Sequence, residues 1–164
     1  MTADKLIKVA MADLNVALVD GVLKTTGLGS CVGLTLYDSR MKVAGMAHVM
    51  LPSSEIAKEG TLNPAKYADT AVPLLIEKMI AIGASVGRME AKMAGGAQMF
   101  QFSANSDSMR IGPRNVESCK ELLLRFGIPL SGEDTGGNYG RTIEFDSSNG
   151  IMLIRSVQHG TKEL

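Results

Sequence analysis

Alternating apolar and polar positions predict many short β-strands along the chain. Runs rich in β-branched and other apolar residues recur through the first fifty residues and again near the end, bounded by turn-forming residues. The predicted strands are Leu6–Ala10, Val16–Val19, Val22–Thr26, Val32–Tyr37, Val43–Leu51, Met89–Met93, Arg141–Phe145 and Ile151–Arg155. Asp38-Ser39-Arg40 and Ser147-Ser148-Asn149-Gly150 are turn sequences, so a hairpin is expected around each of them.

Two further segments have the apolar spacing and the end signals of helices. The first is expected to begin at Asn63-Pro64, because Asn is a good N-cap and Pro suits the first helical position, and to end before Gly83. The second is expected over Asn115–Phe126, with Gly127 ending it. Many strands in hairpins, together with two main helices, predict an α+β fold: an α/β/β-type sandwich of mostly antiparallel sheets with helices over one sheet face.

Composition and charge indicate one globular domain. The 164 residues are 45% hydrophobic, and no repeat, low-complexity tract or linker divides them. We therefore expect a single catalytic domain over residues 1–164, with a flexible polar tail over residues 156–164. Seventeen basic residues balance seventeen acidic ones, which argues against binding to nucleic acid or to an anionic membrane surface.

The sequence predicts a cytoplasmic protein that is not inserted in a membrane. The N-terminus lacks the charged and apolar regions of a signal peptide. The most apolar long stretch, residues 71–84, is interrupted by Glu77 and Lys78 and is too short to span a bilayer.

Neither a metal nor a cofactor is expected from the residue patterns. Cys31 and Cys119 are far apart in the sequence and form no CxxC pair. The glycine clusters Gly95-Gly96-Ala97 and 136–141 match neither a Walker loop nor a GxGxxG fingerprint, so we interpret them as structural turns.

The segment Thr25–Cys31, with His48 seventeen residues after Cys31, is the best candidate for chemistry. Two glycines around one apolar residue allow a sharp turn that can present the thiol. Backbone N–H groups near Gly29 and Ser30 can then converge to form an oxyanion hole. If the flanking strands form a hairpin, His48 lies nearly opposite Cys31 and favours a thiolate–imidazolium pair by lowering the thiol pKa. These residues predict a cysteine hydrolase with His48 as the base.

Purely structural interpretations compete with this one. Free cysteines are usually buried, and a histidine on an apolar strand is often a neutral core residue. A third residue should orient the imidazole, and Thr25 and Thr26 are the candidates. In an extended segment they point to opposite faces, so only one of them can do so, and threonine is also common in strands for its β-propensity alone.

The remaining cysteine and histidine are weaker candidates. Cys119 shares an apolar helix face with Val116 and Leu123, which indicates core packing. His159 lies in the polar C-terminal segment and is expected to be solvated.

Several motifs, in the same order along nearly the whole chain, resemble the CheD family of chemoreceptor glutamine deamidases. The matching segments are Thr25-Thr26-Gly27-Leu28-Gly29-Ser30-Cys31, Ala47-His48-Val49-Met50-Leu51-Pro52, Lys66-Tyr67-Ala68-Asp69-Thr70-Ala71, Gly95-Gly96-Ala97, Ile111-Gly112, Arg114-Asn115 and Gly136-Gly137-Asn138-Tyr139-Gly140-Arg141. Thr26 departs from the pattern, since the family commonly has leucine there. The resemblance implies a catalytic set of Cys31, His48 and Thr25, and a sandwich fold similar to that of bacterial toxin deamidases.

The resemblance also implies a substrate and a partner. The substrates would be glutamine side chains on the cytoplasmic helices of chemoreceptors, converted to glutamate through a cysteine thioester, and glutamate methyl esters could follow the same route. The partner would be a CheC-type phosphatase, whose activity such proteins increase. Two alternatives stay open. One is a mainly non-catalytic module that binds partners of the chemotaxis adaptation system. The other is a phosphate-binding protein using Gly27–Ser30, which no adjacent Lys or Arg supports.

Overall fold

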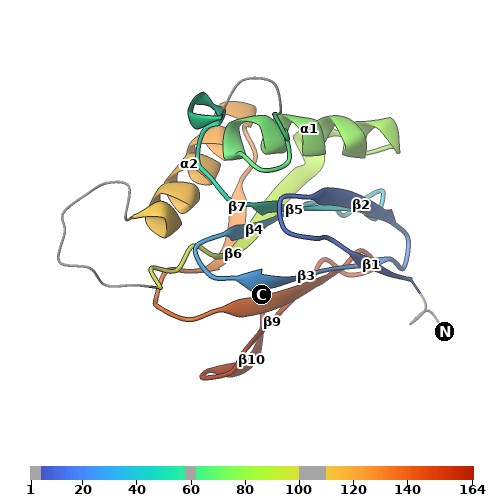
Figure 1. Ribbon diagram of the computed structural model, residues 1–164. Coiled ribbons are helices and arrows are strands. Elements are labelled where there is room, and N and C mark those ends of the chain that lie inside the picture. Colours follow the sequence, from blue (N-terminus) through green and yellow to red (C-terminus); the bar gives the residue numbers. More distant parts are fainter. Residues whose placement is uncertain (1–4, 58–61, 100–109) are drawn as a thin grey trace.

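Two five-stranded sheets are stacked face to face, and two helices cover one of them (Figure 1). The computed structural model describes residues 5–57, 62–99 and 110–164. Its strands are β1 (Leu6–Lys8), β2 (Leu14–Leu18), β3 (Val22–Leu28), β4 (Val32–Asp38), β5 (Val43–Val49), β6 (Met89–Gly95), β7 (Leu130–Thr135), β8 (Arg141–Asp146), β9 (Met152–Ser156) and β10 (Gly160–Glu163). Its α-helices are α1 (Ala68–Ala81) and α2 (Ile111–Phe126), and single 3₁₀ turns lie at Ser54–Ile56 and Val86–Arg88.

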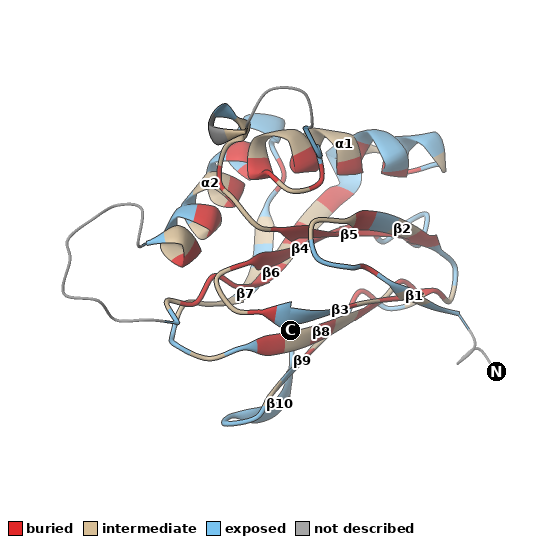
Figure 2. Ribbon diagram, viewed as in Figure 1, coloured by how far each residue is buried: buried red, intermediate tan, exposed pale blue. Residues whose placement is uncertain are grey.

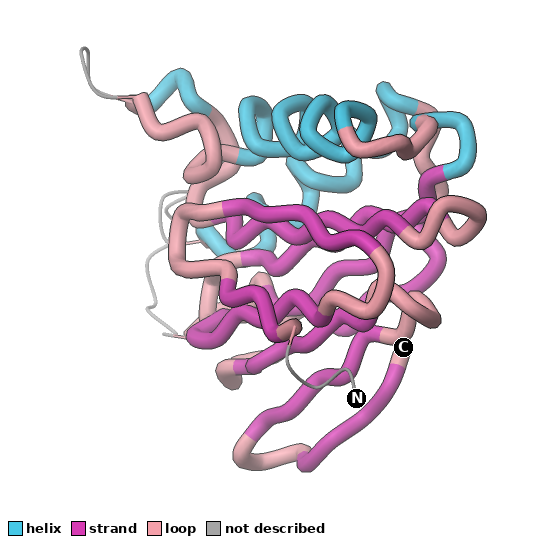
Figure 3. The backbone as a smooth tube through the Cα atoms, turned by 90° about the vertical axis from the view of Figure 1, so that its right-hand side faces the viewer, coloured by secondary structure: helices cyan, strands magenta, loops and turns pink. Residues whose placement is uncertain are grey.

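The order of layers is helices, central sheet, outer sheet, as the side view in Figure 3 shows. The central sheet has strand order β2-β5-β4-β6-β7, and the outer sheet has order β1-β3-β8-β9-β10. Most neighbouring strands are antiparallel, while β1 pairs with β3 and β6 with β7 in parallel. The predicted α+β sandwich is therefore confirmed.

The central sheet is buried on both faces, which explains why its middle strands are apolar throughout. Every residue of β4 and β5 is buried (Figure 2). Val32, Leu34 and Leu36 belong to the core beneath the helices. Tyr37 and Ala44 belong to the second core, between the two sheets. Because side chains alternate along a strand, each strand contributes to both cores.

Both helices begin four residues away from their predicted starts. α1 begins at Ala68 because Tyr67 is held extended in a bridge with Leu51, and Asn63 accepts a hydrogen bond from the Ala65 N–H in a preceding turn. α2 begins at Ile111, so residues 111–114, before the predicted start, form its first turn, where a proline is tolerated. Its end at Gly127 is as predicted, with a φ of 69°.

Two polar strands were not predicted. β7 pairs in parallel with β6 at the edge of the central sheet. β10 pairs with β9 where a flexible tail was expected, so the tail prediction is wrong for residues 160–163. All four residues of β10 are exposed, and its pairing uses backbone hydrogen bonds that require no apolar pattern. Within the described residues, no helix has both the length and the apolar character needed to cross a bilayer.

Candidate active site

A β-bulge at the end of β3 shapes the first part of the site. β3 pairs with β8 through Thr25–Ile143 and again through Leu28–Arg141, so β3 has one extra residue between these pairs. Gly27 takes a φ of +74° there, a conformation that glycine adopts without a steric penalty. As a result Thr25 and Leu28 are both buried, whereas Thr26 is exposed.

Thr25 and His48 meet between the two sheets. His48 lies on β5 with none of its surface exposed, and its Nδ1 is 2.7 Å from the Thr25 Oγ1. When Nδ1 carries the ring proton and donates it to Oγ1, the Nε2 lone pair is free to accept a proton. The geometry places Thr25, and not Thr26, beside the imidazole.

Cys31 enters the same space from the neighbouring strand. In the β4–β5 register Gly33 pairs with His48, and Cys31 stands two residues before Gly33. Residues two apart share a face, so Cys31 and His48 point to the same side and are diagonal neighbours. Such neighbours have Cα atoms roughly 7–8 Å apart. Cys31 accordingly belongs to the core between the sheets, with 6% of its surface exposed.

Gly33 keeps the space beside His48 clear of a β4 side chain. A Cβ at this position would lie 2.6 Å from the Ile143 Cδ1 and 2.9 Å from the Leu28 Cδ1. Real Cβ contacts are longer than this, so the Ile143 and Leu28 side chains would have to move to admit a larger residue. The glycine thus lets the sheets close while leaving the Cys31 and His48 side chains on one face.

The second ring nitrogen of His48 is the clearest unsatisfied group of the site. Within the described residues, the buried Nε2 has no hydrogen-bond partner. Leaving a buried polar atom unpaired costs roughly 1–3 kcal/mol, so such atoms in native proteins call for an explanation. A role in proton transfer would explain this one.

Burial shifts both ionisable groups away from their charged forms. It raises the pKa of the Cys31 thiol and lowers the pKa of the His48 imidazole, because each charged form loses hydration. The sequence predicted the opposite for the thiol. Burial instead favours a neutral thiol and a neutral imidazole over the predicted thiolate–imidazolium pair.

The backbone of the nucleophile loop, residues 29–31, is held in place from the segment after β6. Ala97 N–H donates to the Gly29 carbonyl, and Gly96 N–H donates to the Cys31 carbonyl, each at 2.9 Å. Gly95 has a φ of +104°, and a Cβ there would collide with the Cys31 carbonyl oxygen. The cluster predicted to be a structural turn therefore supports the nucleophile loop directly.

Asn115 is a buried residue of the site that the search for catalytic groups missed. It lies on α2, and its side-chain amide donates to the carbonyls of Ser30 and Met50. Its signal in the sequence is its place in the Arg114-Asn115 motif. The residue was missed because cysteine hydrolysis needs a nucleophile and a base, and asparagine is neither.

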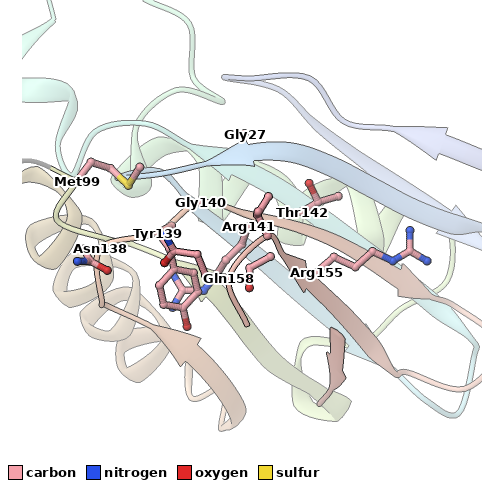
Figure 4. Close-up of a pocket in the computed structure, with 11 residues that line it drawn as sticks. Gly27, Met99, Asn138, Tyr139, Gly140, Arg141, Thr142, Arg155 and Gln158 are labelled. Carbon is pink, nitrogen blue, oxygen red and sulfur yellow. The ribbon is translucent and has the colours of Figure 1, made fainter. Parts of the chain in front are cut away.

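A cavity of about 590 Å³ adjoins the site on the outer sheet (Figure 4). Its lining includes Gly27 of the bulge, and in the close-up Tyr139 lies towards one side and Arg155, on β9, towards the other. The lining residues are Gly27, Met99, Asn138, Tyr139, Gly140, Arg141, Thr142, Arg155, Ser156, Val157 and Gln158. The candidate catalytic side chains do not line it, so it neighbours the reacting centre without containing it.

The other titratable candidates lie elsewhere. Cys119 is fully buried beneath the helices, where burial raises its pKa to about 12. His159 is exposed and stacks on Tyr139, with 4.1 Å between ring centroids. Among the described residues, no group of three or more His, Cys, Asp or Glu side chains is arranged to hold a metal ion.

Comparison with known proteins identifies the family. Residues 50–156 match the family model CheD, described as chemotactic sensory transduction. A protein of Halalkalibacterium halodurans named chemoreceptor glutamine deamidase CheD is 55% identical over 158 residues, which cover 96% of this chain and 98% of that protein. The chain belongs to the CheD family. A Bacillus subtilis CheD of the same name is 49% identical and covers 96% of this chain and 95% of its own length.

The alignments with CheD relatives cover the candidate site residues, whereas the family model does not. The match to the model begins after His48, whereas alignments covering 96% of the chain include Thr25, Cys31 and His48. Among solved structures, a Neisseria meningitidis protein of family-model DUF152 gives a TM-score of 0.47 at 10% identity, over 82% of this chain and 65% of that one. That likeness is too distant to inform the chemistry of this CheD protein.

Proposed function

We propose that this protein deamidates glutamine side chains on the cytoplasmic helices of chemoreceptors, with Cys31 as nucleophile, His48 as base and Thr25 orienting His48. Relatives of that name, about half identical over nearly the full length, support the reaction and its setting in chemotaxis. The observation that supports the residue roles most strongly is the buried imidazole. Its Nδ1 is bonded to Thr25, and its Nε2 has no partner among the described residues.

Acylation is the first half of the reaction. The Cys31 sulfur attacks the carboxamide carbon of the substrate while His48 Nε2 accepts the thiol proton. Backbone N–H groups of Ser30 and Cys31 hold the developing oxyanion, a contribution of roughly 3 kcal/mol for each well-placed donor. The imidazolium then protonates the departing nitrogen, and the C–N bond breaks to release ammonia and leave a thioester.

Deacylation uses the same imidazole. His48 Nε2 removes a proton from a water molecule as the water oxygen attacks the thioester carbon. The C–S bond breaks, the sulfur regains a proton, and the substrate carries glutamate in place of glutamine. A glutamate methyl ester would follow the same path with methanol as the leaving group.

The order of proton transfers follows from burial. Because the pKa of Cys31 is raised and that of His48 is lowered, the resting pair is neutral, and charge appears only as the carbonyl is attacked. The low exposure of Cys31 also keeps bulk water away from the thiol. Because water is excluded, the attraction between the developing oxyanion and the backbone N–H groups would be stronger than in bulk water.

The same protein would also bind a CheC-type phosphatase in the cytoplasm and stimulate it. This second role follows from the family resemblance of the motifs. It does not require the thiol, so a chain without catalysis could still carry it out.

A Cys31→Ala variant tests the proposal and separates the two roles. Purified cytoplasmic fragments of a chemoreceptor would be incubated with each protein, with ammonia release and conversion of glutamine to glutamate followed by mass spectrometry. We expect conversion with the wild type and with Cys119→Ala, and none with Cys31→Ala. Conversion by Cys31→Ala would overturn the enzymatic assignment, and phosphatase binding by that variant would show that the two roles are separable.

A further inference from the structure

Asn115 joins the two halves of the candidate site through one side-chain amide. Its Nδ2 donates to the Ser30 carbonyl and to the Met50 carbonyl, both at 2.9 Å. Ser30 immediately precedes Cys31, and Met50 stands two residues after His48. Asn115 is fully buried, and α2 carries it. One rigid group therefore sets the position of the nucleophile loop relative to the strand that carries the base.

The bond to Ser30 also fixes the direction of a neighbouring N–H. In a trans peptide the carbonyl and the following N–H point in opposite directions. Holding the Ser30 carbonyl therefore orients the Cys31 N–H, and the bond from Ala97 to the Gly29 carbonyl orients the Ser30 N–H in the same way. Neither N–H donates a hydrogen bond to another described residue. Both N–H groups are therefore available, within the described residues, to donate to an oxyanion.

Close packing makes the support for Asn115 rigid. A Cβ at Gly112 would collide with the Ala97 carbonyl oxygen, and a Cβ at Gly96 would collide with Val116. The first turns of α2 thus lie directly on the segment that holds the Gly29 and Cys31 carbonyls. Displacing the helix would move all three held carbonyls together.

The amide has a feature that packing alone does not account for. Its Oδ1 is buried and has no hydrogen-bond partner within the described residues. An apolar residue of similar size would avoid this unsatisfied oxygen, and it would give up the two donated bonds. The presence of asparagine here is explained if those donated bonds serve the site.

We propose that Asn115 is a positioning residue that aims the Cys31 N–H group at the oxyanion of the reaction, beside the Ser30 N–H group that the bond from Ala97 orients. The proposal rests on the proposed deamidase function. Asn115 touches neither the substrate nor the reacting atoms, and it acts through the peptide plane between Ser30 and Cys31. The competing interpretation is that it only ties α2 to the rest of the fold.

An Asn115→Ala variant separates positioning from general support when turnover is compared with alkylation of Cys31 by iodoacetamide. Alkylation displaces iodide and places no charge on a carbonyl oxygen, so it does not use an oxyanion hole. We expect kcat to fall about 100-fold, the size of effect seen on losing one oxyanion donor, with KM changed only a few-fold. We expect the alkylation rate to stay within about two-fold of the wild type, because the thiol itself is not displaced. Wild-type kcat, or kcat and alkylation falling in parallel, would overturn the proposal.

Ser118→Ala is the matched control. Ser118 also lies on α2 and donates to a backbone carbonyl after β5, that of Pro52 at 2.8 Å, without contacting the nucleophile loop. We expect it to keep wild-type kcat. If Asn115 variants do not fold while Ser118→Ala does, Asn115 belongs to the stability of the fold and the proposal is wrong.

Asn115→Asp gives an independent readout through pH. An ionised carboxylate offers no donor to the two carbonyls, whereas its protonated form regains one. Burial raises the pKa of a carboxyl group, so protonation falls within an accessible range. We expect the activity of Asn115→Asp relative to the wild type to rise as the pH falls, and a constant ratio would contradict the proposal. Failure of the deamidase function itself would look different, because the wild type would then convert no glutamine, or Cys31→Ala would convert it as well.

Discussion

Strands β4 and β5 run through both ends of the space between the sheets, and they contribute very different pairs of side chains at each end. At one end β4 contributes Tyr37 opposite the small Ala44, and at the other it contributes Gly33 opposite His48. Tyr37 packs edge-on against Phe145, with 5.5 Å between ring centroids, and its hydroxyl donates to the Ser147 carbonyl at 2.8 Å. The Nε2 of His48 has no such partner among the described residues.

This contrast shows how one core can combine stability with chemistry. At the Tyr37 end a large side chain fills the space, and its own hydroxyl has a hydrogen-bond partner. At the His48 end Gly33 contributes no side chain, Thr25 points inward beside the imidazole, and a ring nitrogen has no hydrogen-bond partner within the described residues. The difference predicts that substitutions at one end change turnover and those at the other change stability.

His48→Ala should have the largest effect on turnover. Loss of a positioned acid–base group typically reduces the rate about 10²–10⁴-fold, and His48 would serve both halves of the reaction. The rate of glutamine conversion per folded protein is the measurement. Thermal unfolding should change far less than at the aromatic end, and retained turnover would show that another group is the base.

Phe145→Ala should lower stability and leave turnover almost unchanged. Truncating a buried phenylalanine typically costs about 3–5 kcal/mol of the free energy of unfolding, because it leaves a cavity. Urea unfolding measures this loss, and kcat of the folded fraction should stay close to the wild type. A large fall in kcat at temperatures where the variant is folded would mean that the two ends are coupled.

Thr25 and Thr26 are neighbours in the sequence, and we expect only Thr25 to affect turnover. Thr25→Val removes the hydroxyl beside His48 Nδ1 and keeps the shape, so kcat should fall about ten-fold, as for a lost hydrogen bond of roughly 1.5 kcal/mol. Thr26→Val is the matched control because Thr26 is exposed on the other face, and it should change kcat less than two-fold. Equal effects of the two substitutions would remove Thr25 from the site.

Near neutral pH, the change of turnover with pH should be smaller than the effects of the substitutions that lower it. Turnover requires neutral His48, whose pKa is lowered by burial, so activity should persist somewhat below pH 6.5 and fall only on further acidification. The Cys31 thiol has a raised pKa, so its alkylation rate should keep increasing through and beyond pH 8.5. A plateau of alkylation well below pH 8.5 would instead indicate a stable thiolate–imidazolium pair.

Local patterns predicted the hairpin that carries the site. The alternation in residues 32–51 and the turn after Asp38 were sufficient to place His48 near Cys31, because hairpin register follows from the turn and the apolar pattern. The end of α2 at Gly127 was also predictable from a local signal, because a glycine after the last apolar turn commonly ends a helix.

Features set by distant parts of the chain were not predictable in this way. The burial of Leu28 on the same face as Thr25 depends on a bulge defined by pairing with β8. The raised thiol pKa depends on how deeply the stacked sheets bury Cys31. Asn115 is more than eighty residues away from the loop it holds, and β10 has no apolar pattern to reveal it.

Interception of the acyl-enzyme by hydroxylamine tests the central claim, a covalent reaction at Cys31, most directly. Hydroxylamine competes with water for a thioester and converts the bound acyl group into a hydroxamate that mass spectrometry distinguishes from glutamate. The wild type and Thr26→Val should both form glutamyl hydroxamate on receptor fragments, in a share that grows with hydroxylamine concentration, and Cys31→Ala should form none. Glutamate as the sole product at every hydroxylamine concentration, or hydroxamate formed by Cys31→Ala, would contradict the account.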